Sequence, residues 1–467
     1  MKRNFALIFL RYRKLYHEYH ESFTNQHEYL LRKFLNSFVF IRHYSCLFVV
    51  LLFFLAGCAL KPLQIKDAKE IKPVNRSKAY YHFCLGSLNE SKGELSKALS
   101  EYKKAYSFDK TSSAALLKIS SIYFLSSDLK EAHHFANKAK EIAPDKEEVY
   151  LLLTRIYHRE GKIEEAVSAL EAATRINPKN KEAFYLKGSL HVQIEDYEKA
   201  ITDYKRVIEL DPYFLAPYFN IGSLYAKMDR LKEASGILKE AIRIAPDEER
   251  LYLALAAVYE ALGKTKELKG LLEEGLKVAG DNPVILSLLG LLLMEDEECQ
   301  KAISILEKLT KINPKDDEVY YHLGICYDKT GEFQKALDSF YQTISLNPGH
   351  ARAYNYIGYL YAERGIELKK AVSLVKKALE IEPENGAFID SLGWAYFQSK
   401  EFDKALFELK RAINFTKDDP IIYEHLGDAY LACGKAKEAI EFWKKAKDLG
   451  GDSKEIRKKI EEAEREK

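Results

Sequence analysis

KEAFYLKGSLHVQIEDYEKAITDYKRVIELDP, residues 181–212, is the stretch that decides the fold. Residues 215–246 follow as LAPYFNIGSLYAKMDRLKEASGILKEAIRIAP. Both stretches place a glycine at the eighth position, an alanine at the twentieth and a proline at the thirty-second. Between these marks, apolar residues recur at intervals of three and four, which is the period of an amphipathic helix. Each stretch therefore predicts two helices followed by a turn at the proline.

The same marks recur every 34 residues over most of the chain. The prolines are Pro144, Pro178, Pro212, Pro246, Pro314 and Pro348. The alanines are Ala98, Ala132, Ala166, Ala200, Ala234, Ala302, Ala336, Ala371, Ala405 and Ala439, and the glycines include Gly86, Gly188, Gly222, Gly290, Gly324, Gly358, Gly393 and Gly427. A repeat of this length is typical of stacked helix pairs in which each unit packs only on its neighbours. The sequence thus predicts an all-α solenoid.

Small residues at fixed positions have a physical role in this pattern. The glycine at the eighth position and the alanine at the twentieth allow the two helices of a unit to approach closely. A tyrosine at the eleventh position, such as Tyr225, is expected to pack in the groove between helices. A second set of glycines, Gly93, Gly161, Gly263, Gly331, Gly365 and Gly434, is predicted to end the first helix with a positive φ.

This pattern resembles the tetratricopeptide repeat. The resemblance implies a right-handed superhelical solenoid of about eleven helix pairs over residues 79–453. The sixth unit departs from the pattern with Leu268 in the alanine position, and the ninth carries one extra residue after Gly365. The charged tail, residues 454–467, is predicted to form a helix that caps the last apolar face.

Composition limits the classes of function. The 72 basic and 70 acidic residues give a net charge of +2, without the basic stripe of a nucleic-acid-binding protein. The cysteines of the repeats have no zinc-ligand spacing, and they are expected to be small buried hydrophobic residues. No phosphate-binding motif or catalytic constellation is found. We therefore expect no enzyme activity, no metal and no cofactor.

The N-terminal region is predicted to contain a targeting signal. Basic residues precede an apolar run at 46–60 that is too short to span a bilayer comfortably. The run ends Leu55-Ala56-Gly57-Cys58, which resembles the bacterial lipoprotein signal. The resemblance implies cleavage before Cys58, lipidation of its sulfur and a tether over residues 58–78. The alternative is an uncleaved signal anchor.

Two further features concern this leader. Residues 1–57 form an unusually long signal segment, so translation is expected to begin downstream, near Leu30 or Leu31. Ala59 follows the cysteine in place of an acidic residue. By resemblance to enterobacterial lipoproteins, this favours the outer membrane over the inner membrane and a lipid-anchored protein that faces the periplasm.

The last repeats have a narrower resemblance. Residues 355–359, 390–396 and 425–430 are similar to bacterial envelope lipoproteins with tetratricopeptide arrays. In this repeat type, the second, fifth, ninth and twelfth positions of the first helices line a concave surface. The candidate partner-binding residues at these positions are Tyr185, Phe219, Tyr321, Arg352, Asn355, Tyr359, Asp390, Trp394 and Phe397. The alternative is that these aromatic side chains pack against neighbouring helices.

These observations predict an interaction protein. Aromatic residues flanked by charges suit an extended peptide or a partner helix, and Trp394 is the strongest single candidate. The leading hypothesis is a membrane-anchored protein–protein interaction scaffold of the bacterial cell envelope. The alternatives are a periplasmic chaperone or assembly and export factor, and a non-catalytic subunit of an envelope glycan system.

Overall fold

The computed structural model describes residues 75–451 and 454–465, and within them every regular element is a helix. The predicted all-α repeat architecture is confirmed. The leader 1–57 and the proposed lipidation site Cys58 lie outside the described residues. No helix in the described ranges combines the length and the apolar side chains needed to cross a bilayer.

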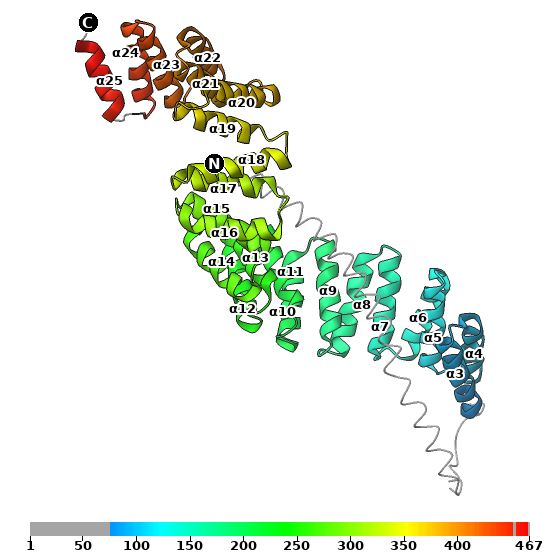
Figure 1. Ribbon diagram of the computed structural model, residues 1–467. Coiled ribbons are helices and arrows are strands. Elements are labelled where there is room, and N and C mark those ends of the chain that lie inside the picture. The colour runs from blue at the N-terminus through cyan, green and yellow to red at the C-terminus, as the bar shows by residue number, and fades with distance from the viewer. Residues whose placement is uncertain (1–74, 452–453, 466–467) are drawn as a thin grey trace. The chain divides into compact units, whose positions relative to one another are not determined.

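The helices form eleven consecutive pairs, with one further helix at the C-terminal end (Figure 1). The pairs are α3 (Arg76–Ser91) with α4 (Leu95–Phe108), α5 (Ser113–Leu125) with α6 (Leu129–Ile142), α7 (Glu147–Arg159) with α8 (Ile163–Ile176), α9 (Lys181–Gln193) with α10 (Tyr197–Leu210), α11 (Ala216–Lys227) with α12 (Leu231–Ile244), α13 (Glu249–Ala261) with α14 (Thr265–Ala279), α15 (Pro283–Glu295) with α16 (Cys299–Ile312), α17 (Asp317–Lys329) with α18 (Phe333–Leu346), α19 (Ala351–Glu363) with α20 (Leu368–Ile381), α21 (Gly386–Gln398) with α22 (Phe402–Phe415), and α23 (Pro420–Ala432) with α24 (Ala436–Asp448). The single helix is α25 (Lys454–Arg465). We number the pairs as repeats 1 to 11.

Packing is local throughout the described array. The two helices of a pair contact each other, and the second helix of each pair contacts the first helix of the next. Consecutive first helices also touch, as α19 with α21 and α21 with α23 do. The core is therefore a continuous row of small contacts between neighbouring units.

The turn inside each pair depends on one residue with a left-handed backbone. The six glycines predicted for this role have φ between 65° and 81°, so that prediction is confirmed. In the other five repeats the same position holds Ser127, Glu195, Asp229, Glu297 or Lys400, with φ between 58° and 62°. The next residue closes the helix end, as the N–H of Lys162 does by donating to the carbonyl of Tyr157 at 2.9 Å. The left-handed residue is thus constant although its glycine is not, and repeat 9, with its extra residue, adds a second one at Glu367 with a φ of 48°.

Close approach inside a pair explains the small residues at the eighth and twentieth positions. A Cβ on Gly427 would lie 2.5 Å from the Trp443 ring, which is closer than atoms can pack. The ten alanines at the twentieth position are completely buried. The helices of a pair therefore meet where small residues leave room for the facing side chain.

Helix α25 repeats the pattern of a first helix. Its buried residues Ile456, Ile460 and Ala463 follow the buried Ile422, Leu426 and Ala429 of α23 by 34 positions each. At its eighth position Glu461 replaces the usual small residue, and the side chain is 67% exposed. One face of α25 therefore covers repeat 11 and the other is charged, as predicted for a cap.

Candidate partner-binding surface

The candidate surface is one side of the first helices. Positions in each repeat are counted so that Gly188 of α9, and the residue aligned with it in every other repeat, is position eight. We define the first-helix face as the side chains at the second, fifth, ninth and twelfth positions of α7, α9, α11, α13, α15, α17, α19, α21 and α23. The nine predicted partner-binding residues belong to this face and lie on α9, α11, α17, α19 and α21. Asn220 on α11 donates to Tyr185 on α9, Arg352 on α19 donates to Glu318 on α17, and α19 contacts α21, so neighbouring members of the set can act together.

Contacts between position five of one repeat and position six of the next recur along this face. Such pairs are Tyr185 with Asn220, Tyr321 with Tyr356, Asp390 with His425, and Glu424 with Lys459. Partners are 35 residues apart, one more than the repeat period. Sequence reasoning missed these pairs because it considered positions two, five, nine and twelve alone. A search for complementary residues 35 apart would have found them.

The N-terminal members of the face are held by aromatic neighbours. The Tyr185 ring lies 5.4 Å from the Tyr204 ring and 5.2 Å from the Phe214 ring, and its hydroxyl accepts a hydrogen bond from Asn220 at 3.2 Å. Burial raises the pKa of Tyr185 above its usual value. On α11, the Phe219 ring is half-buried and lies 5.7 Å from the Arg250 guanidinium. Both side chains thus pack partly against the protein itself.

Tyr321 is covered, which corrects the expectation that it faces solvent. It is 8% exposed because the His350 ring lies 4.8 Å away and the Arg352 guanidinium lies 4.8 Å above its ring. Arg352 also donates to Glu318 at 2.7 Å. The nearby imidazole of His350, whose Nε2 atom lies 3.7 Å from the Glu318 carboxylate, and the charge of Arg352 lower the pKa of Glu318 to about 2. Arg352 is therefore already engaged within the protein.

Asp390 is also covered, against expectation. It is 7% exposed, and both its carboxylate oxygens lie within 3.1 Å of the Nδ1 atom of His425. Burial alone would lower the pKa of His425, but the charge and hydrogen bond of Asp390 raise it above its usual value. Asp390 and His425 thus join repeats 10 and 11 as a buried ion pair whenever the imidazole is protonated.

Trp394 is half-buried in a stack of rings. Its centroid lies 4.9 Å from that of Phe397 and 4.2 Å from that of His425, with interplanar angles of 9° and 14°. Phe397 is also half-buried and contacts Phe402. The exposed parts of Trp394 and Phe397 therefore belong to a rigid shelf, which suits a binding surface because little side-chain entropy is lost on contact.

Asn355 and Tyr359 lie one turn apart on α19, and both are half-buried. The Oδ1 atom of Asn355 is buried and has no hydrogen-bond partner in the described part of the chain. Burial, together with the charges of Glu363, Asp390 and Asp328, raises the pKa of Tyr359 to about 12. This part of the first-helix face is therefore rich in hydrogen-bond acceptors.

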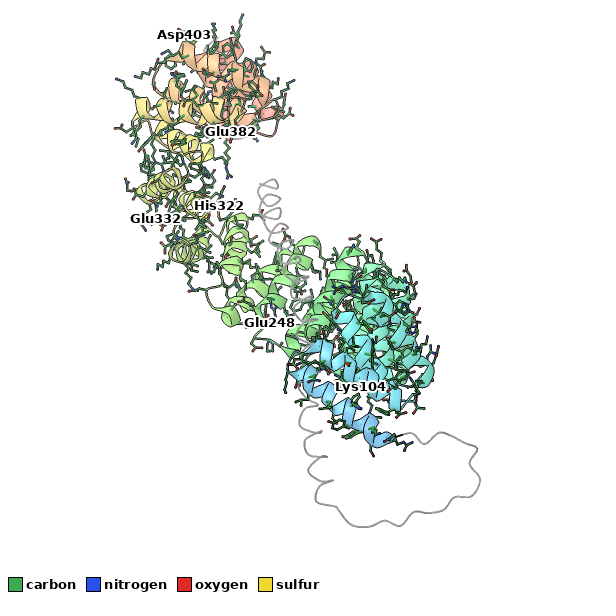
Figure 2. All side chains as sticks on the ribbon, turned by 90° about the vertical axis from the view of Figure 1, so that its right-hand side faces the viewer. Lys104, Glu248, His322, Glu332, Glu382 and Asp403 are labelled. Carbon is green, nitrogen blue, oxygen red and sulfur yellow. The ribbon has the colours of Figure 1, made fainter. Side chains whose placement is uncertain are left out.

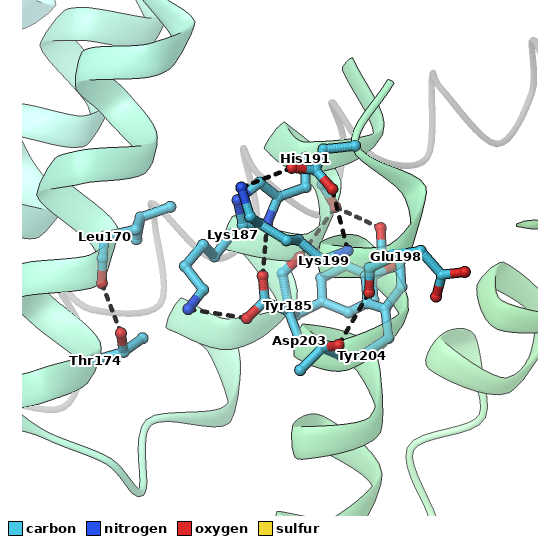
Figure 3. A network of polar contacts seen from close by, with 12 residues as sticks. Leu170, Thr174, Tyr185, Lys187, His191, Glu198, Lys199, Asp203 and Tyr204 are labelled. Atoms are coloured by element: carbon cyan, nitrogen blue, oxygen red, sulfur yellow. Dashed lines mark hydrogen bonds and ion pairs between the residues drawn. The ribbon is translucent and has the colours of Figure 1, made fainter. Parts of the chain in front are cut away.

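A second polar cluster lies inside repeat 4 (Figure 3). The carboxylate of Asp203 lies 2.9 Å from the Nζ atom of Lys187 and 2.7 Å from the Nδ1 atom of His191. Asp203 and His191 are buried, and Lys187 is 14% exposed at its side chain. Each group is satisfied by the others, and the cluster ties α9 to α10. We assign it a structural role.

Other side chains offer little for chemistry. Cys299 and Cys326 are buried, as expected for these cysteines, whereas Cys84 and Cys433 are half-buried; none of these four described cysteines forms a disulfide bond. Burial raises the pKa of Cys326 to about 12, so its thiol stays protonated near neutral pH. Charged residues such as Lys104, Glu382 and Asp403 extend into solvent (Figure 2). The described residues bring no three metal-ligating side chains together.

Comparison with protein-family models identifies the repeats. The models described as "Tetratricopeptide repeat" and "TPR repeat" match residues 123–190, 188–229, 215–248, 318–350, 393–434 and 421–449. The chain is a tetratricopeptide-repeat protein. Families of this type generally act by binding rather than by catalysis.

Curated relatives of this tetratricopeptide-repeat protein match over short segments. It is 34% identical over 88 residues to the BBSome complex member BBS4 of Bos taurus, which is 19% of this chain and 17% of that protein. It is 31% identical over 83 residues to the small glutamine-rich tetratricopeptide repeat-containing protein 2 of Saccharomyces cerevisiae, which is 18% of this chain and 24% of that protein. The chain thus spans less than a quarter of the length of these relatives.

Three solved structures are similar to parts of this chain. The tetratricopeptide-repeat protein YrrB, described as having an unusual peptide-binding site, is 25% identical, with a TM-score of 0.37, over 40% of this chain and 95% of its own. A thermophilic tetratricopeptide-repeat protein of Thermus thermophilus is 26% identical, with a TM-score of 0.35, over 39% of this chain and 98% of its own. Yeast Tom70 is 15% identical, with a TM-score of 0.36, over 83% and 95% of the two chains.

Proposed function

We propose that this protein is a membrane-tethered scaffold of the bacterial cell envelope that binds other proteins on its first-helix face and catalyses no reaction. The observation that carries the proposal is the rigid shelf of half-buried Trp394 and Phe397 on α21, with half-buried Tyr359 on the preceding first helix α19. Rigid aromatic residues beside polar groups are typical of the energetically important centre of a protein interface. Their binding role is part of the proposal.

The tether and the compartment are supported by the sequence. The segment Leu55-Ala56-Gly57-Cys58 closes an apolar run, and a lipid on Cys58 would attach the repeats to a membrane. Ala59 favours the outer membrane, with the repeats facing the periplasm. Metabolic labelling with palmitate tests the anchor: label in the wild-type chain and none in Cys58→Ala is expected. Label that persists in Cys58→Ala contradicts lipidation at this residue.

Site-specific cross-linking tests the binding face. Benzoylphenylalanine in place of Phe397 is expected to form ultraviolet-dependent adducts with a defined partner protein in living cells. The matched control is the same replacement at Phe407, which is 68% exposed on the second helix α22. Adducts at Phe407 but not at Phe397 would place the binding surface elsewhere on the repeats.

Two alternative functions differ in how a partner is bound. A periplasmic chaperone or assembly factor would suppress aggregation of unfolded clients and would give many weak adducts at Phe397. A scaffold, including a non-catalytic subunit of an envelope glycan system, would give one stoichiometric adduct. We favour the scaffold because the aromatic shelf is rigid, whereas promiscuous binding is typical of flexible, methionine-rich surfaces, and the whole chain has three methionines.

A further inference from the structure

The stripe Asn355, Tyr359 and Glu363 on α19 contrasts with the equivalent stripe on α7. The three residues are four positions apart, so they lie on one side of the helix. They present an amide oxygen, a phenol ring and a carboxylate. The equivalent stripe on α7 is Leu151, Arg155 and Arg159, which donates hydrogen bonds and carries positive charge. The two stripes therefore suit partners of opposite charge.

The acceptors around Tyr359 exceed the donors that the protein supplies. Asp328 on α17 accepts from the Tyr356 hydroxyl at 3.1 Å and lies 3.6 Å from Arg364. Asp390 on α21 is bound by His425. Within the described residues, Glu363 has no ion-pair partner and is exposed, and the buried Oδ1 atom of Asn355 accepts no hydrogen bond. A buried acceptor without a donor is costly unless a ligand or water supplies one.

Two properties of this place favour a planar cation over a simple point charge. The acceptors are spread over two turns of α19, so one donor group must reach in several directions. Among the described side chains no cation lies above the Tyr359 ring, whereas the rings of Tyr225, Tyr259, Tyr396 and Tyr430 each have two. A guanidinium has five N–H donors in one plane and stacks on aromatic rings.

The protein itself contains this kind of contact between the neighbouring first helices α5 and α7. The Arg155 guanidinium lies 4.7 Å from the centre of the Phe124 ring, and that of Arg159 lies 5.9 Å from it. Arginine on an aromatic ring is thus compatible with the spacing of neighbouring first helices. Around Tyr359 the described part of the chain supplies the ring and the carboxylates but no arginine on the ring.

We propose that Asn355, Tyr359 and Glu363 bind the guanidinium of an arginine in an extended segment of the protein partner. The amide oxygen and the carboxylate accept its N–H groups, and the phenol ring lies beneath its plane. Asp328 and Asp390 add negative potential from the neighbouring helices. The inference rests on the proposed binding function of the first-helix face and adds the chemical class of the bound segment.

Peptide selection with the full chain tests this inference. Random linear peptides displayed on phage are selected against the wild-type protein, and the selected pools are tested against Glu363→Lys. The matched control is Glu380→Lys, because Glu380 is exposed on the second helix α20 of the same repeat and has no ion-pair partner among the described residues. We expect arginine to be enriched, relative to the unselected library, in peptides that the Glu363→Lys variant fails to bind and the Glu380→Lys variant still binds. Circular dichroism confirms that both variants are folded.

A second step separates charge from shape. In a selected peptide, citrulline in place of arginine keeps the shape and removes the charge, and we expect binding to weaken by about tenfold or more. Lysine should weaken binding less than citrulline, and Asn355→Leu should weaken the arginine peptide more than the lysine peptide. These measurements use fluorescence anisotropy of the labelled peptides.

The outcomes distinguish this inference from the proposed function. Peptides that depend on Glu363 but show no arginine enrichment, or that bind equally well with citrulline, overturn the arginine site and leave a first-helix-face binder in place. Failure of the proposed function itself is seen in the cross-linking experiment, as adducts at Phe407 without adducts at Phe397.

Discussion

Repeats 4 and 11 fill the same three interior positions by opposite means. In repeat 4, positions seven, eleven and twenty-three hold Lys187, His191 and Asp203, joined by an ion pair from Lys187 and a hydrogen bond with His191 (Figure 3). In repeat 11 the same positions hold Leu426, Tyr430 and Phe442, and the last two rings stack at 5.1 Å with an interplanar angle of 9°. The fold therefore requires that side chains fill these positions and that any polar group there has a partner. Both the polar cluster of repeat 4 and the apolar side chains of repeat 11 meet this requirement.

The largest loss of folding stability is expected from breaking the polar cluster of repeat 4. Asp203→Leu leaves two buried groups without their common partner, which costs about 3–5 kcal/mol. Because stability in a solenoid is local, hydrogen exchange of α9 and α10 should report the loss more strongly than that of α23 and α24. A loss below about 1 kcal/mol would mean that water replaces the carboxylate.

The matched variant converts repeat 4 to the chemistry of repeat 11. Lys187→Leu, His191→Tyr and Asp203→Phe together should restore the hydrogen-exchange protection that Asp203→Leu loses. Relative to the wild-type protein, we expect the free energy of unfolding to rise by between zero and about 4 kcal/mol. A triple variant that is less stable than Asp203→Leu would contradict the equivalence of the two repeats.

The next largest loss of folding stability is expected from adding a side chain where the two helices of a pair pack closely. A Cβ on Gly427 would lie 2.5 Å from the Trp443 ring, and one on Gly188 would lie 2.8 Å from the Tyr204 ring. Each Gly→Ala change should cost about 1–3 kcal/mol by overpacking. Gly427→Ala should cost more because Trp443 is held by a 2.9 Å hydrogen bond to Asp428. Chemical denaturation measures both.

The control for these changes is Gly236→Ala. Gly236 is exposed on α12, and a Cβ there would meet nothing within 4 Å. Replacing it should stabilise the helix by about 0.5–1 kcal/mol. If all three alanine variants gave the same change, close packing at the eighth position would not be the reason for its glycines.

The smallest change in folding stability is expected from substitutions in the turn inside each pair. Glu195 of repeat 4 has a φ of 60°, and Gly434 of repeat 11 has a φ of 74° at the equivalent position. Glu195→Gly should stabilise the protein by up to about 1 kcal/mol, because relief of the left-handed backbone is partly offset by chain entropy. Gly434→Ala should destabilise it by about 1 kcal/mol. Thermal unfolding of both variants tests the opposite signs, and a shift of the same sign in both would contradict this account.

Much of the fold could be predicted because its cause is local and periodic. The glycine at Gly427 and the alanine at Ala439 mark a close helix contact that any sequence with this spacing must make. The glycines at the inner turns revealed the positive φ, but Glu195 and Lys400 adopt the same backbone without any signal of their own. Those turns were predictable from their position in the repeat and not from the residue they carry.

The candidate surface was predicted less completely, because exposure depends on neighbours. Tyr321 and Asp390 occupy the expected positions on the first-helix face, yet His350 and Arg352 cover the first and His425 covers the second. Tyr359 occupies position nine as Trp394 does, but it is surrounded by carboxylates where Trp394 is stacked between rings. Position within a repeat does not distinguish these cases.

The sequence by itself determined the helix pairs, their number, their turns and the close contact within each pair, since all of these arise from residues within one repeat or at its period. The tertiary structure alone decided which side chains of the first-helix face are paired and which keep free acceptors. Those contacts join residues 35 positions apart, between neighbouring repeats. Their strength depends on distances and burial that form only when the first helices pack together.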